Sequence, residues 1–256
     1  MSHRAITLGY WWPSMHKEAL EYVKKCDQCQ RFAPNIHQPG GQLNPLSSPW
    51  PFAQWGLDIL GPFPKVAGNK KFLLVGTDYF TKWVEAEALA NIRDVDVKKF
   101  VWKNIVTRFR TPHTLISDNG LQFDNKTFRR YCNELGIVNQ YSTPAYPQGN
   151  GQAEAINKTI VNGLKKRLDD AKGRWVDELA HVLWTYRTTP RRSTGETPFS
   201  MTYGAEAVIP LEVNFPTQRT TAFCPIANDK LLEKSLDLID EAWTLSTKEG
   251  KVQWSI

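Results

Sequence analysis

The chain has little that would place it in a membrane or an oxidising compartment. No apolar run in its 256 residues approaches the roughly 18 residues of a transmembrane helix, and the N-terminus lacks the apolar segment of a signal peptide. Its four cysteines are too few for a disulfide framework in a chain of this length. We therefore expect a soluble intracellular protein without a membrane partner, in which Cys132 and Cys224 are ordinary thiols.

The composition is that of a folded protein with one concentrated basic region. Hydrophobic residues make up 41% of the chain and aromatic residues 12%, which is enough to bury a core. Lys and Arg number 32 against 26 Asp and Glu, a net charge of +6. Residues 155–192 contain nine basic and four acidic residues and so carry +5 of that charge. This concentration favours a local polyanion-binding surface over a diffuse excess of solvated charge.

The hydrophobic pattern predicts an α/β fold. Short runs rich in β-formers predict strands at 55–60, 72–79, 82–89, 114–117 and 137–142. Apolar residues at helical spacing predict helices at 14–26, 94–109, 125–135, 152–171 and 175–188. The order of these elements from residue 55 onward predicts a mixed sheet flanked by helices. Before the long helix, a mobile loop is predicted from Pro144, Pro147, Gly149 and Gly151.

Three acids stand where the local pattern does not require one. Asp58 interrupts the apolar strand Trp-Gly-Leu-Asp-Ile-Leu, Asp118 ends the apolar strand Leu-Ile-Ser, and Glu154 lies in the first turn of the long helix. Singly, each has a structural explanation: a hydrogen-bonded strand acid, a turn former and a partner for the helix dipole. Together they match the needs of phosphoryl transfer, because carboxylates on neighbouring elements can hold two Mg²⁺ ions about 3.5–4 Å apart.

The long helix carries its acid beside basic residues. At about 100° per residue, Glu154, Lys158 and Lys165 lie near one another on the helix surface. One carboxylate and two ammonium groups would then face a single groove, as a metal ligand with phosphate contacts beside it. The alternative is an i,i+4 Glu–Lys pair on a solvated helix, which is common and contributes little. The buried side of this helix is predicted to comprise Ala153, Ile156, Ile160, Leu164 and Ala171.

The spacing of the acids and the sequence around them resemble one protein family. Thirty-five residues separate Asp118 from Glu154. The segments WGLDILGPFP, LISDNGLQF, TPAYPQGNGQAEAINKTI and LWTYRTTPRRSTGETPFSMTYGAEAVIP resemble the integrases of gypsy-type long-terminal-repeat retrotransposons, over about residues 9–213. The resemblance implies a ribonuclease-H-like fold, with a five-stranded mixed sheet flanked by helices and an Asp-Asp-35-Glu catalytic core.

The resemblance also assigns individual residues. The catalytic, Mg²⁺-binding acids of the family fall on Asp58, Asp118 and Glu154. The DNA-contacting Asn and Lys that follow the glutamate fall on Asn157 and Lys158. Val161 stands where the family has a second basic residue, and we expect Lys165 to take that role. Asp78 also lies in a strand, but the family's motif does not use it.

The N-terminal cysteines form half of a zinc site. A tetrahedral Zn²⁺ needs two ligands besides Cys26 and Cys29, and in the family these are two closely spaced histidines upstream. Only His3 and His16 precede Cys26 here, and their separation does not fit. We therefore expect no four-ligand zinc site, but a partial zinc-binding domain in a chain truncated at both ends relative to the family.

Composition and resemblance together divide the chain into four parts. Residues 1–36 are predicted to be the partial, helical zinc-binding domain, and residues 37–50 a linker rich in Pro and Gly. Residues 51–212 are predicted to be the integrase catalytic core. Residues 213–256 are predicted to be a helical extension, with a helix at 228–243.

The resemblance implies an enzyme of DNA integration, a polynucleotidyl transferase that uses Mg²⁺ or Mn²⁺. In this family, a water activated by the metal ions cuts near the 3′ end of the element's DNA, and the exposed 3′-hydroxyl then attacks target DNA. The implied partners are retroelement ends and target DNA, and the implied location is the nucleus. Joining two ends together favours a homo-oligomer.

Three other functions compete with this one. A catalytically inactive, nucleic-acid-binding remnant of a retroelement polyprotein would keep the fold without turnover, although retention of all three acids argues against it. A ribonuclease H proper would share the fold and the metals, but the 35-residue spacing favours an integrase. A zinc-dependent interaction module would depend on Cys26 and Cys29 alone.

Overall fold

The computed structural model describes residues 6, 9–26, 48–118, 120–141, 148–171 and 174–208. At Glu154 and at both ends of the long helix it describes the backbone alone. The predicted helix at 228–243 lies outside the described residues, as do Cys29, Cys224, Pro144 and Pro147.

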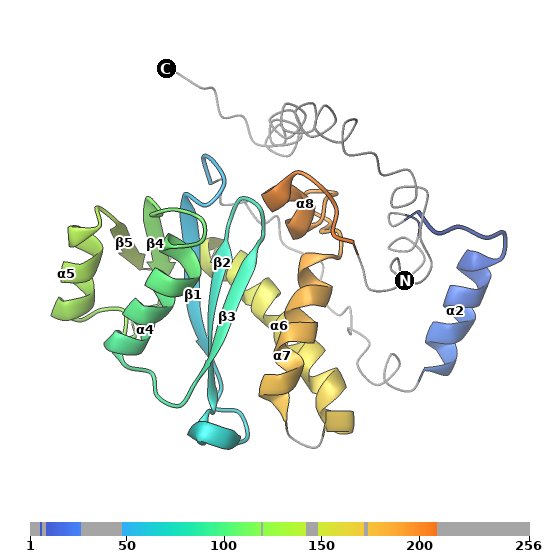
Figure 1. Cartoon of the computed structure of the whole chain (residues 1–256), viewed down its shortest axis with the longest axis horizontal. Helices are drawn as coiled ribbons and strands as arrows, with labels where there is room; N and C mark the ends of the chain where they lie inside the picture. The colour runs from blue at the N-terminus through green and yellow to red at the C-terminus, as the bar shows by residue number, and fades with distance from the viewer. Residues whose placement is uncertain are drawn as a thin grey trace. The chain divides into compact units, whose positions relative to one another are not determined.

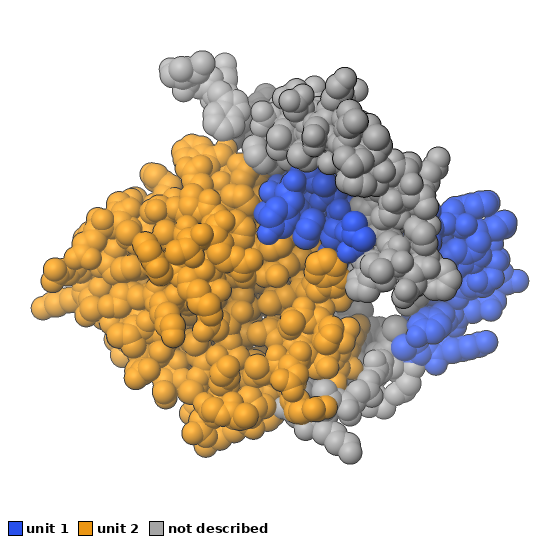
Figure 2. Space-filling model, viewed as in Figure 1, with its two compact units in different colours: residues 1–39, 188–249 blue, residues 40–187, 250–256 orange. Residues whose placement is uncertain are grey.

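The chain divides into two compact units (Figure 2). One comprises Met1–Pro39 and Thr188–Glu249, and the other Gly40–Arg187 and Gly250–Ile256. The first contains the helices α2 (Met15–Lys25) and α8 (Pro198–Tyr203). The second contains the sheet and its helices: β1 (Gln54–Leu60), the short 3₁₀ turn η1 (Ala67–Asn69), β2 (Phe72–Asp78), β3 (Val84–Leu89), α4 (Asp94–Phe100), the π-helical turn η2 (Val101–Val106), β4 (Thr114–Ser117), α5 (Lys126–Glu134), β5 (Val138–Tyr141), α6 (Gln148–Ala171) and α7 (Trp175–Arg187).

The five strands form one mixed sheet in the order β3-β2-β1-β4-β5. β1, β2 and β3 pair antiparallel, because short turns connect them. β4 joins β1 in parallel, and β5 joins β4 in parallel, because helices cross over between β3, β4 and β5. The predicted five-stranded mixed sheet flanked by helices is confirmed.

Helices cover both faces of the sheet (Figure 1). On one face, Leu73 and Val75 of β2 form a buried cluster with Ile160 and Leu164 of α6 and with residues of α7. On the other face, a Cβ added at Gly76 of β2 would lie 3.2 Å from the Phe100 ring, so α4 approaches the sheet there. The alternation of β2 therefore assigns α6 and α7 to one side of the sheet and α4 to the other.

Two boundaries differ from the sequence-based prediction. Gly149 and Gly151 are helical residues in α6, which begins at Gln148, so the loop predicted through them was wrong at those positions. Glycine disfavours a helix interior, but both glycines lie within the first turn or so of α6, where fewer helical hydrogen bonds depend on them. The helix predicted at 94–109 is α4 followed by η2, in which Val97, Val101 and Ile105 are buried.

Asp78, the strand acid outside the family's motif, has a structural role at the end of β2. Its side chain is buried, and it accepts hydrogen bonds from Phe52 N at 3.1 Å and from Thr81 N and Oγ1, both at 2.7 Å. It thereby holds both the turn into β3 and the loop before β1. Burial nevertheless raises the pKa of Asp78 to about 6, because desolvation of the carboxylate outweighs these bonds.

This raised pKa predicts a pH dependence of stability. Between about pH 4 and pH 6 the folded state binds the proton of Asp78 more tightly than the unfolded state. The free energy of unfolding should therefore fall as pH rises through this range, by about 3 kcal/mol at most. The side chain of Asp78→Asn cannot titrate. In this variant, the free energy of unfolding measured by urea denaturation at pH 4, 5 and 6.5 should not show the fall that is due to Asp78. Parallel profiles for the two proteins would contradict the assignment.

Candidate active site

Two of the three predicted acids lie on neighbouring parallel strands. β1 and β4 pair with Gly56 beside Ile116, and continuing that register by two residues places Asp118, just past the end of β4, beside Asp58. Paired positions on adjacent strands project to the same face. The register of β1 and β4 therefore directs Asp58 and Asp118, the residue that follows β4, toward the same end of the sheet.

Asp58 is held by its surroundings, whereas Asp118 is open to solvent. The half-buried Asp58 carboxylate accepts a hydrogen bond from Ile59 N at 2.8 Å and another from the side chain of Asn157 on α6. Asp118 is exposed and accepts a bond from Gly120 N at 3.1 Å. One acid is thus fixed from the helix side, and the other is held by the loop that follows it.

Glu154 enters this region through α6. It lies three residues before Asn157, less than one helical turn away and on a neighbouring part of the helix surface. Because Asn157 bonds to Asp58, this part of α6 lies over β1. The side chain of Glu154 is not described, so the structure places its backbone near Asp58 and no more.

The predicted DNA-binding residues differ in burial. Asn157 is 4% exposed, and its side-chain amide nitrogen donates a hydrogen bond to Asp58. Its oxygen has no hydrogen-bond partner among the described residues. Lys158 and Lys165 are both exposed, while Ile156, Ile160 and Leu164 of the same helix are buried, as is Ala153. The predicted division of α6 into a core side and a basic, solvent-facing side is confirmed for these residues.

The chemistry of these groups suits a hard divalent cation. Asp58 and Asp118 offer carboxylate oxygens from adjacent strand positions, and the buried Asn157 oxygen beside them is an unused acceptor. Mg²⁺ and Mn²⁺ prefer such oxygen ligands. No cluster of three or more metal-ligating residues occurs among the side chains that the structure describes. The side chain of Glu154 is not one of the described side chains.

A hydrogen-bond network that the sequence did not reveal supports the loop after Asp118. Tyr141 of β5 donates to Asp124 Oδ1 at 2.7 Å, and Asn139 donates to Tyr141 Oη at 2.8 Å and to Phe123 O at 3.1 Å. Arg129 of α5 also bonds to Asp124 at 2.7 Å, and these bonds from Tyr141 and Arg129 lower the pKa of Asp124. The partners are up to seventeen residues apart, so no local motif indicates them.

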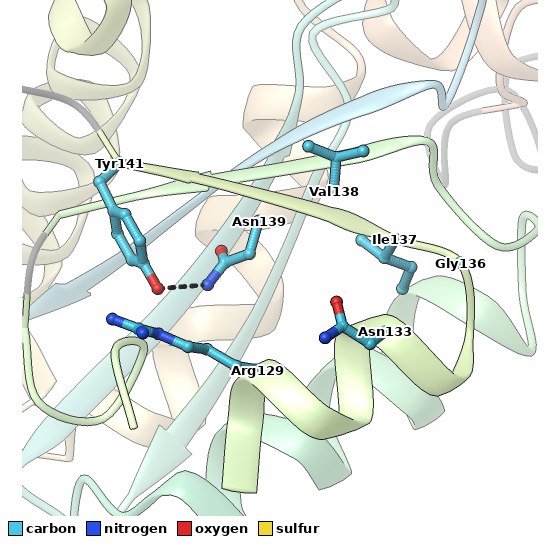
Figure 3. Close-up of a pocket in the computed structure, with 7 residues that line it drawn as sticks. All are labelled: Arg129, Asn133, Gly136, Ile137, Val138, Asn139 and Tyr141. Atoms are coloured by element: carbon cyan, nitrogen blue, oxygen red, sulfur yellow. Dashed lines mark hydrogen bonds between the residues drawn. The ribbon is translucent and has the colours of Figure 1, made fainter. Parts of the chain in front are cut away.

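This network borders a pocket of about 650 Å³ between α5 and β5 (Figure 3). Tyr141, Asn139 and Arg129 come from the two sides of the pocket. None of the three predicted acids is among its lining residues, which are Arg129, Asn133, Gly136, Ile137, Val138, Asn139 and Tyr141. The polar side chains of Arg129, Asn139 and Tyr141 in this pocket therefore already bond to Phe123 or Asp124, in the loop after Asp118.

The remaining predictions concern cysteine and membranes. Cys26 is half-buried at the end of α2, and Cys29 is outside the described residues, so the expected absence of a zinc site stays a prediction. Burial raises the pKa of the Cys132 thiol to about 11, which agrees with an unreactive cysteine. Across the described ranges, no helix is both long and apolar enough to cross a membrane.

The mixed five-stranded sheet flanked by helices is a ribonuclease-H-like fold, and Asp58 on β1 with Asp118 just after β4 forms its candidate phosphoryl-transfer site. Residues 49–147 match the family model of the integrase core domain, and residues 2–35 match that of the integrase zinc binding domain. The resemblance to retrotransposon integrases is confirmed, because residues 49–147 are similar to integrase core domains. The core match includes Asp58 and Asp118 but ends before Glu154.

Curated relatives point to the same class. The Tf2-3 and Tf2-4 transposon polyproteins of Schizosaccharomyces pombe are each 27% identical to this chain over 212 residues. The match covers 81% of this chain but 16% of each polyprotein. The chain thus corresponds to a small part of a retrotransposon polyprotein.

Solved structures share the fold. The HTLV-2 integrase catalytic core domain in complex with magnesium superposes with a TM-score of 0.51 at 21% identity, covering 61% of this chain and 99% of that one. A chain of the simian T-cell lymphotropic virus intasome in complex with PP2A regulatory subunit B56 gamma gives 0.55 at 22% identity, covering 80% and 72%. At these identities the likeness shows the fold alone.

The network around Tyr141 generates a prediction. Removing its hydroxyl in Tyr141→Phe takes one hydrogen bond from Asp124, so the 120–124 loop should open more often. Amide hydrogen exchange in this loop should become several-fold faster, with little change in the strands β1 and β2.

Tyr131 of α5 provides the control for this substitution. Its hydroxyl is buried and has no hydrogen-bond partner in the described part of the chain, so Tyr131→Phe should leave exchange in the loop unchanged. Equal exchange rates in Tyr141→Phe and the parent protein would show that the loop does not depend on this network.

Proposed function

We propose that this chain is the catalytic part of a retroelement integrase, which cuts and joins DNA with Mg²⁺ or Mn²⁺. The proposal is carried by two features: the parallel pairing of β1 with β4, which directs Asp58 and the residue after β4, Asp118, to one end of the sheet, and the bond from Asn157 of α6 to Asp58. The proposal includes both reactions, 3′-end processing and strand transfer. The oxygen of water forms the new bond to phosphorus in the first reaction, and a 3′-hydroxyl oxygen forms it in the second. In both, the nucleophile loses a proton, the bond from phosphorus to a 3′-oxygen breaks, and that leaving oxygen takes up a proton.

The protein's own groups have distinct parts in this proposal. Asp58, Asp118 and Glu154 would hold the cations, which when bound stabilise negative charge on the attacking and leaving oxygens. Asn157 keeps one Asp58 oxygen oriented by donating to it. Asp118, being exposed, offers its oxygens at the open end of the sheet, where a DNA strand has access.

DNA binding is assigned to the basic side of α6. Lys158 and Lys165 are exposed on the helix that also carries Glu154. Their ammonium groups are therefore solvated and available to phosphates of a DNA strand along this helix. We propose that they contact phosphates in line along α6 beyond Glu154, Lys158 about one helical turn from it and Lys165 about three turns from it. Binding of retroelement ends and target DNA, assembly into a homo-oligomer and action in the nucleus are parts of the same proposal.

The domain assignment extends this proposal to the rest of the chain. We propose a catalytic core at 51–212, a region similar to the integrase zinc-binding domain at 1–36 joined by a linker at 37–50, and a C-terminal extension at 213–256. The core match at 49–147 and the zinc binding domain match at 2–35 support the first two assignments.

The first test removes one charge from the site. Asp118→Asn should abolish both cutting and strand transfer on a labelled DNA end with Mn²⁺, because a neutral amide is a poor ligand for a hard cation. The fold should be unchanged, since Asp118 is exposed and an asparagine oxygen can still accept from Gly120 N. A parent protein that is itself inert would leave the DNA-binding remnant as the better description.

The second test separates binding from catalysis. Lys158→Ala should weaken DNA binding and lower the slope of log K against log salt by about 0.9, the effect of one lost phosphate contact on duplex DNA. Lys99→Ala removes the same charge from an exposed position on α4, across the sheet, and should leave the slope unchanged. Equal effects of the two substitutions would mean that DNA binding is not localised on α6.

A further inference from the structure

Tyr79, which follows β2, lies against the strand that carries Asp58. It is 1% exposed, and its backbone N–H donates to Gln54 O at 3.0 Å, which fixes the start of the side chain next to β1. A Cβ added at Gly56 would lie 2.5 Å from the Tyr79 hydroxyl oxygen and 2.8 Å from the ring carbon that bears it. The phenol therefore occupies the space that a side chain at position 56 would need.

The same ring reaches all three acid-bearing elements. Gly56 lies two residues before Asp58 on β1, and so on the same face of the strand. Tyr79 also forms one buried cluster with Ile116 of β4 and Ala153 of α6. Ile116 lies two residues before Asp118, and Ala153 immediately precedes Glu154.

We propose that Tyr79 is a positioning residue of the active site, whose ring fixes the spacing between the three elements that carry Asp58, Asp118 and Glu154. The inference rests on the function proposed above for that site. A rigid planar ring suits this role because it keeps its shape when the surrounding elements pack against it, whereas a flexible aliphatic side chain can change its rotamer. Two cations clamped by three carboxylates tolerate little displacement, and misplacement by about 1 Å can cost on the order of 100-fold in rate.

The hydroxyl of Tyr79 is compatible with this position. Burial raises its pKa above the usual range, and the negative charge of Asp58 raises it further. The phenol therefore stays neutral at physiological pH and adds no negative charge beside the acids. Glycine at position 56 is then explained by the close approach of this ring, since any larger residue would displace it.

The test measures Mn²⁺ binding to the full chain without DNA, by electron paramagnetic resonance of the free ion, in parallel with strand transfer. Tyr79→Leu removes the ring and should weaken Mn²⁺ binding by about tenfold or more. Tyr79→Phe retains the ring, and its affinity for Mn²⁺ should stay within about threefold of that of the parent protein. Gly56→Ala keeps the Tyr79 residue but displaces its ring, and should weaken Mn²⁺ binding as well.

Two controls distinguish positioning from general destabilisation. Phe100→Leu alters a buried ring on the opposite face of the sheet and should leave Mn²⁺ affinity unchanged, even with a similar loss of stability. In the double variant Gly56→Ala/Tyr79→Leu, the alanine should cause no further loss, because the ring that it would displace is already absent. Additive losses, or equal weakening by Phe100→Leu, would overturn the proposal.

Failure of this inference can be told apart from failure of the proposed function. A parent protein that binds Mn²⁺, loses it in Asp118→Asn and yet never joins DNA contradicts the integrase activity alone, and the variants above still decide the role of Tyr79. Unchanged Mn²⁺ affinity in Tyr79→Leu, together with active strand transfer, contradicts the role of Tyr79 alone. A parent protein that binds no Mn²⁺ overturns both.

Discussion

The parallel pairing of β1 with β4 is the constraint on which the candidate site depends. Asp58 and Asp118 are sixty residues apart in the sequence, and the register of these two strands brings them side by side. Side chains alternate between faces along a strand, so a slip of one residue would send Asp118 to the opposite face. The buried residues on both faces of the sheet make such a slip costly, and in this way the core protects the geometry of the site.

The long helix α6 connects this sheet edge to the basic surface. Its buried side packs on β2 and α7, and a Cβ added at Gly163 would lie 2.9 Å from Val182, so the two helices approach closely there. This packing fixes the rotation of α6, and the bond from Asn157 to Asp58 follows from that rotation. Lys158 and Lys165 remain on the solvent side, because the same rotation turns them away from the core.

Much of the fold followed from local patterns. Each predicted strand of the sheet appears within two residues of its expected ends, because a short β-rich run bounded by turn residues is a local signal. The helix of α5 was predicted for the same kind of reason: Asn125 caps its start by accepting from Phe128 N, and Gly136 follows its end with a positive φ. The early start of α6 and the helix α8 were missed, because their first turns contain residues that are also common in loops.

The sequence by itself determined which acids are present, their 35-residue spacing and the division of α6 into apolar and basic sides. These are properties of residue type and separation along the chain, and the resemblance to integrase cores depends on them. Only the tertiary structure decided that the Asn157 side chain donates a hydrogen bond to Asp58 and that Tyr141 bonds to Asp124 in the loop after Asp118. It also decided that the Tyr79 ring fills the space above Gly56. Each of these contacts joins residues from different elements, and periodicity along one element carries no information about its neighbour across the sheet.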